Sequence, residues 1–95
     1  MITHIVLFKL KDRSPESVER TAQVLRDMEG KIDVLLSIEV GVDVLHTERS
    51  YDIALTTRFA SMDDLQAYQV HPVHQKVIGH MTAARESSVS VDYVS

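Results

Sequence analysis

The run Ile2–Leu10 constrains the possible folds more strongly than any other stretch, because both of its alternating sides are largely apolar. One side carries Val6, Phe8 and Leu10, and the other carries Ile5. A strand of this kind is typical of the middle of a sheet, where both faces are covered. The remaining chain must therefore supply the edge strands and the elements that cover the faces.

The next element is a helix, recognised from its end signals and its periodicity. Ser14 and Pro15 begin it, since serine caps free amides and proline suits the first helical position. Apolar residues then recur at helical spacing as far as Met28, and Gly30 favours a left-handed stop. The charges in segment 13–29 are interpreted as the exposed face of this helix.

Three further strands and a second helix follow. Residues 37–43 alternate between apolar and polar, which predicts a half-solvated edge strand, and residues 51–59 return after a polar loop as a second central strand. Ser61 begins a helix that must break at Pro72, because proline lacks an amide proton. Residues 88–93 alternate again and predict the other edge strand.

This order predicts an α+β protein with a four-stranded antiparallel sheet, whose first and third strands lie centrally and whose helices cover one face. The other face is expected to carry Val6, Phe8 and Leu10 of the first strand. That would leave a larger apolar patch than monomers normally expose. We therefore expect a homodimer in which sheet packs against sheet.

The composition limits the class of protein. The 95 residues suffice for one core, so residues 1–95 are expected to form a single domain. The net charge is −4 and the basic residues are scattered, which disfavours nucleic acid as a partner. There is no cysteine, no signal-peptide pattern, and no apolar run near the roughly 18 residues of a membrane span. These features indicate a cytoplasmic protein without a membrane partner.

Chemistry is most expected around Pro72, where Tyr68, His71 and His74 lie close in sequence. On an unbroken helix of 3.6 residues per turn Tyr68 would share a face with His71, so only a break at Pro72 brings it to His74. As a functional pair, His74 would remove a proton next to a carbonyl and Tyr68 would donate a hydrogen bond to the carbonyl oxygen. The alternative is a packed, hydrogen-bonded histidine without reactivity.

Two other histidines have open interpretations. His4 is the polar exception on its side of the first strand, and one polar group among apolar neighbours is typical of a small-molecule pocket. It could equally be a buried histidine bonded to a backbone carbonyl. His71 is more simply explained as a cap of the second helical segment or a loop anchor. No metal site is expected, because His71, His74 and His80 have no nearby carboxylate in a ligand-like pattern.

Four short pieces occur in an order typical of one known family: His4-Ile5-Val6-Leu7-Phe8-Lys9-Leu10, Ile38-Glu39-Val40-Gly41, Tyr51-Asp52-Ile53-Ala54-Leu55, and Tyr68 with His71-Pro72-Val73-His74. Together they resemble the Dabb family, the stress-responsive dimeric α/β-barrel domains. The resemblance implies a ferredoxin-like protomer whose dimer closes two sheets into a barrel, with a cavity between sheet and helices. It extends to the plant polyketide (olivetolic acid) cyclases, which use acid/base chemistry without metal or cofactor. On that resemblance their catalytic pair matches Tyr68 and His74, and their pocket histidine matches His4.

The first functional hypothesis is a cavity that binds a small apolar or aromatic molecule, with His4, Val6, Phe8 and His71 as ligand contacts. It includes cofactor-independent acid/base catalysis of the cyclase or isomerase kind. The alternative is a non-catalytic stress-response or binding protein in which the same residues are structural. Cofactor-free oxidation of an aromatic substrate, as in the wider dimeric-barrel group, has little support, since the chain has no Trp and no distinct redox residue.

Overall fold

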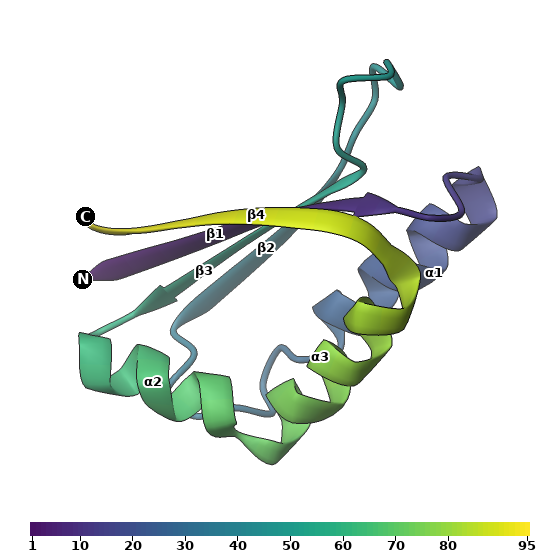
Figure 1. The fold of residues 1–95 in the computed structure, drawn as a ribbon. Helices are drawn as coiled ribbons and strands as arrows, with labels where there is room; N and C mark the ends of the chain where they lie inside the picture. The colour runs from purple at the N-terminus through teal and green to yellow at the C-terminus, as the bar shows by residue number, and fades with distance from the viewer.

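A computed structural model describes residues 1–95 as one sheet with three helices on one side (Figure 1). The elements are β1 (Ile2–Leu10), α1 (Pro15–Arg26), β2 (Ser37–Val42), β3 (Ile53–Phe59), α2 (Met62–Val70), α3 (Pro72–Ala84) and β4 (Arg85–Val94). All strand pairs are antiparallel and the sheet order is β2-β3-β1-β4. This is the ferredoxin-like arrangement. The predicted α+β fold, with the first and third strands central, is confirmed.

The helix boundaries follow from the predicted end signals. The Ser14 side chain accepts a hydrogen bond from the Ser17 amide, and Pro15 is the first helical residue of α1. α1 ends at Arg26, and Gly30, with φ of 79°, lies in the turn beyond it. The Ser61 hydroxyl caps α2 in the same way as Ser14 caps α1. Serine caps therefore start the two helices that follow β1 and β3.

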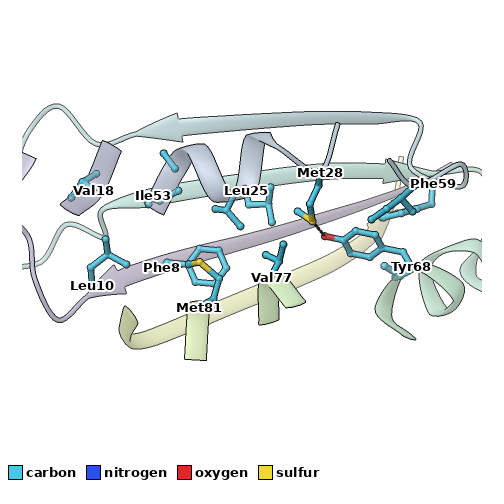
Figure 2. Packing of buried hydrophobic residues seen from close by; sticks show 14 of the residues in the cluster. Phe8, Leu10, Val18, Leu25, Met28, Ile53, Phe59, Tyr68, Val77 and Met81 are labelled. Atoms are coloured by element: carbon cyan, nitrogen blue, oxygen red, sulfur yellow. Dashed lines mark hydrogen bonds between the residues drawn. The ribbon is translucent and has the colours of Figure 1, made fainter. Parts of the chain in front are cut away.

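The core lies between the sheet and the helices, as Figure 2 shows. α1 and α3 supply one wall and the inward side chains of β1 and β3 supply the other. Its buried members are Ile2, Phe8, Leu10, Val18, Ala22, Leu25, Met28, Ile32, Ile53, Leu55, Phe59, Leu65, Tyr68, Val77 and Met81.

The prediction of which side of β1 stays uncovered is wrong. Phe8 and Leu10 are buried in the core beneath the helices, and Val6 packs against that core. The face without helices carries the odd-numbered side of the strand instead. We call this surface the open face; its apolar members are Ile5 and Leu7 of β1 with Val89, Val91 and Tyr93 of β4. Both sides of β1 are apolar, so alternation alone could not tell which one meets the helices.

A buried carboxylate ties the β2–β3 loop to the end of β1. Asp52 is only 2% exposed. Its carboxylate accepts a hydrogen bond from the Leu10 amide at 2.8 Å and forms an ion pair with Arg13, whose Nε lies 2.9 Å from Oδ1. Arg13 also donates to the loop carbonyls of Thr47 and Ser50. The sequence predicted that Arg13 belongs to the exposed face of a helix. In the structure it instead binds Asp52 and the loop. The loop itself rises on the side of the sheet away from the helices (Figure 1).

The two ends of the chain lie side by side at one end of the sheet (Figure 1). The Ser95 amide donates to the Met1 carbonyl at 2.9 Å. No helix is both long and apolar enough to span a bilayer.

Candidate active site

A cavity of about 190 Å³ lies within the core layer, between β1 and α3. Eight of the residues around it are hydrophobic, and the polar ones stand at its two ends. The lining residues are His4, Val6, Phe8, Leu25, Met28, Leu55, His74, Val77, Ile78, Met81, Thr82 and Arg85. An apolar chamber with a few polar groups is the usual form of a small-molecule site.

A larger depression of about 450 Å³ lies beside the β2–β3 loop, but it is wide open and contains neither His4 nor His74. The smaller cavity is the better candidate because it places two imidazoles, those of His4 and His74, among mostly apolar side chains.

His4 stands at one end of the cavity and is bound to a carboxylate. Its Nδ1 contacts Asp92 Oδ1, because β1 and β4 pair with His4 directly opposite Asp92. A carboxylate can only accept, so Nδ1 carries the proton and the ring tautomer is set. Nε2 of His4 has no partner within the protein. Every fully buried polar side-chain atom in this structure has a partner, so the unpartnered Nε2 is accessible, on a residue that lines the cavity.

His74 supplies a second imidazole to the same cavity. Its Nδ1 donates to the Gln69 carbonyl at 3.3 Å, which again leaves Nε2 without a protein partner. Burial lowers the pKa of the His74 imidazole, and the contact with the Gln69 carbonyl opposes that shift only in part. A positive charge on His4 lowers the His74 pKa further. His74 is therefore a neutral acceptor at neutral pH.

Tyr68 packs against His74 but does not line the cavity. The rings of Tyr68 and His74 stack with centroids 4.0 Å apart and planes 29° apart. The break at Pro72 thus brings these two residues together, as expected. The Tyr68 hydroxyl is fully buried and donates only to the sulfur of Met28 at 3.9 Å, the contact drawn in Figure 2. Burial raises the pKa of the Tyr68 phenol well above its usual value, so the hydroxyl keeps its proton.

The structure gives His71 a local backbone contact outside the cavity. Its Nδ1 accepts a hydrogen bond from the Val73 amide at 3.1 Å and so caps α3. His71 itself is extended, with ψ of 137°, as the residue before a proline prefers. These contacts fit the interpretation of His71 as a helix cap. His71 does not line the cavity, so the cavity gives no support to its predicted contact with a ligand.

Two site residues escaped the sequence analysis. Asp92 appeared only as a polar residue of an edge strand, and its pairing with His4 depends on the register of β1 against β4. Arg85 carried no signal in the sequence, whereas it lines the cavity and pairs with Leu10, at the other end of β1 from His4. His4, Val6 and Phe8 line one cavity, and their contact with a ligand stays a prediction. No three His, Cys, Asp or Glu side chains gather into a possible metal site.

Comparison with known proteins assigns the chain to a family. The model of the Dabb family, described as the stress responsive A/B barrel domain, matches residues 2–95. The chain belongs to the Dabb family. It is 28% identical to the stress-response A/B barrel domain-containing protein DABB1 of Arabidopsis thaliana, covering 100% of this chain and 47% of that protein. This Dabb chain therefore spans about half the length of the plant relative.

Solved structures agree with the Dabb assignment. A dimeric protein of unknown function with a ferredoxin-like fold, from Bacteroides fragilis, is 33% identical, with a TM-score of 0.80 over 97% of this chain and 93% of that one. A hydroxynitrile lyase from Passiflora edulis is 16% identical, with a TM-score of 0.84 over 99% of this chain and 92% of that one. The second likeness concerns the fold alone.

The lowered pKa of His74 predicts a pH dependence of stability. The unfolded chain protonates this histidine below about pH 6.5, whereas the folded protein resists protonation. The unfolded state then binds more protons, so the free energy of unfolding should fall as the pH falls from about 6.5 through the folded pKa. Urea unfolding at fixed protein concentration should show this loss between pH 7.5 and 5.5. His74→Gln should reduce it, while the exposed His80→Gln should not; an unchanged slope in His74→Gln would contradict the prediction.

Proposed function

We propose that this protein binds a small apolar or aromatic molecule in its internal cavity and moves a proton on it without a cofactor. The observation that carries the proposal is the pair of imidazoles, His4 and His74, which line one apolar cavity and each leave Nε2 without a protein partner. Two titratable groups with different environments are the usual basis of acid/base catalysis.

The two imidazoles suit different roles. His74 is neutral at pH 7 and acts as the base that removes a proton from carbon next to a carbonyl group. The electron pair moves to the carbonyl oxygen, and a hydrogen bond from Nε2 of His4 stabilises this oxygen when both ring nitrogens of His4 carry a proton. The contact with Asp92 holds the His4 ring in place. Return of the proton to a different carbon completes an isomerisation. Attack of the carbanion on a second carbonyl forms an alkoxide, which takes the proton back from His74 and so completes a cyclisation.

Tyr68 has a supporting role in this proposal. Its stacked ring fixes the plane of His74, and its hydroxyl is screened from the cavity by Met28. The phenol can donate to a ligand once the flexible Met28 side chain moves aside. The resemblance to plant polyketide cyclases at Tyr68 and His74 supports the same class of chemistry.

We also infer that the protein is a homodimer joined through its open face. Val91 is 53% exposed and Tyr93 46% exposed, although both belong to an apolar row. Covering this row removes apolar surface from water. The relative from Bacteroides fragilis with the same fold is dimeric, which supports the inference.

The test measures proton exchange directly. Acetophenone in D₂O exchanges its methyl protons slowly, and ¹H NMR follows the loss of their signal. We expect the wild type to accelerate this exchange at pH 7, and His4→Gln or His74→Gln to reduce the acceleration by roughly 100-fold or more. His80→Gln changes an exposed imidazole on the same helix as His74 and should leave the rate unchanged.

A second readout separates catalysis from binding. Acetophenone should shift the amide resonances of Val6, Phe8 and Met81 in ¹H–¹⁵N spectra, because these residues line the cavity. Shifted amide resonances without accelerated proton exchange would contradict the acid/base catalysis and support a non-catalytic binding protein. That alternative is favoured by the Tyr68 hydroxyl, which is buried against the sulfur of Met28. Absence of both would contradict the proposed ligand class.

A further inference from the structure

The end of the cavity opposite His4 carries an unpaired cation. Arg85 is half-buried, lines the cavity, and has no ion pair or side-chain hydrogen bond within the protein. Thr82, whose hydroxyl also lacks a hydrogen bond within the protein, lines the cavity beside it. Arg20, Arg49 and Arg58 are unpaired as well, but they are exposed and line no part of this cavity. Arg85 is thus a half-buried cation at the side of an apolar cavity, and the chain supplies no acceptor for it.

Strand register separates the two polar ends. Arg85 pairs with Leu10 on β1, and Asp92 pairs with His4, so the guanidinium and the imidazole enter from opposite ends of the strand. The backbone positions are roughly 20 Å apart at about 3.3 Å per residue, and Val6 and Phe8 line the cavity between them. The side chains of Arg85 and His4 each span part of this distance. The space that remains between the guanidinium and the imidazole suits the apolar chain of a ligand.

We propose that Arg85 binds the carboxylate of the ligand, so the natural ligands are apolar carboxylic acids and the substrates are keto acids. This rests on the proposed function, because the carbonyl must lie near His4 and His74. A guanidinium presents paired N–H donors that match a carboxylate, and the bonds are charge-assisted. One guanidinium balances the single charge of a carboxylate, whereas a phosphate monoester brings close to two. The cavity thus orders the ligand as carboxylate, apolar chain and carbonyl.

The test compares two probes that differ only in charge. Hexanoate and hexanamide have the same chain, and ¹H–¹⁵N NMR titration at pH 7 gives the dissociation constant of each. We expect the wild type to bind hexanoate roughly 10- to 100-fold more tightly, the range for a hydrogen bond to a charged group. Arg85→Gln should remove this difference and leave hexanamide binding unchanged. Arg85→Lys should keep part of it, because the charge stays but the paired donors are lost.

Arg20→Gln is the matched control, since it removes the same charge from the exposed side of α1. It should leave both dissociation constants within about twofold of the wild type, as expected for a screened surface charge. Equal binding of hexanoate and hexanamide, or an equal loss of hexanoate binding in Arg20→Gln, would overturn the role of Arg85 and leave the proposed cavity function intact. Failure of both probes to shift the cavity residues Val6 and Phe8 would overturn the two proposals together.

Discussion

Val91→Asp is expected to convert the homodimer into monomers. Val91 lies opposite Ile5 in the β1–β4 pair and belongs to the apolar row of the open face. Dimer formation would bury the new carboxylate against apolar side chains, where it has no partner. A two-fold interface contains the substitution twice. At a cost of at least ~2 kcal/mol for each buried, unpaired carboxylate, the dissociation constant should rise about 1,000-fold or more.

Sedimentation equilibrium over a range of protein concentrations measures this change. The matched control is Val70→Asp, because Val70 is 72% exposed at the end of α2, away from the open face. It should dimerise as the wild type does. The circular dichroism of monomeric Val91→Asp should stay native, since Val91 is already half-exposed within one protomer. A Val91→Asp protein that remains dimeric would place the interface on another surface.

Among substitutions outside the apolar core, Asp52→Ala is expected to lower the free energy of unfolding most. The carboxylate is buried, and its removal leaves the Leu10 amide and the Arg13 guanidinium without their acceptor. Loss of one partner of a buried charged pair costs about 3–5 kcal/mol, and the partial exposure of Arg13 brings the expected loss to about 2–4 kcal/mol. The β2–β3 loop should also loosen, because Arg13 holds its carbonyls only while Asp52 holds Arg13.

Urea unfolding at one fixed protein concentration gives the free energy of unfolding for this comparison. Asp33→Ala is the control, since Asp33 is exposed and bonds only to the neighbouring Val34 amide; its effect should stay within about 0.5 kcal/mol. Arg13→Ala and the double variant complete a cycle that isolates the pair. Strictly additive single effects would show that Asp52 acts through the Leu10 amide alone.

The element order could be predicted because it depends on short-range physics. Ser14 and Ser61 cap their helices by accepting nearby amides, and Pro72 breaks a helix because its nitrogen has no proton. The four short pieces that indicated the Dabb family can likewise be read from the sequence, because each consists of residues close together along the chain. Even the meeting of Tyr68 with His74 followed from the break between them.

The site itself was only partly predictable. The sequence singled out His4 as the polar residue on one side of the first strand and His74 as the partner of Tyr68, and both line the cavity. Their difference in role was not predictable, because it depends on contacts with Asp92 and Gln69 and on burial in the folded chain.

Local sequence was enough to predict the elements, their order, the helix ends and the family. The folded chain was needed to show which side of β1 meets the helices, which residue lies opposite His4, and where Arg13 and Arg85 lie. The physical reason is that caps, breaks and alternation act between residues close along the chain. Face and register are instead set by packing over the whole sheet, where two apolar sides of one strand are equivalent until the helices cover one of them.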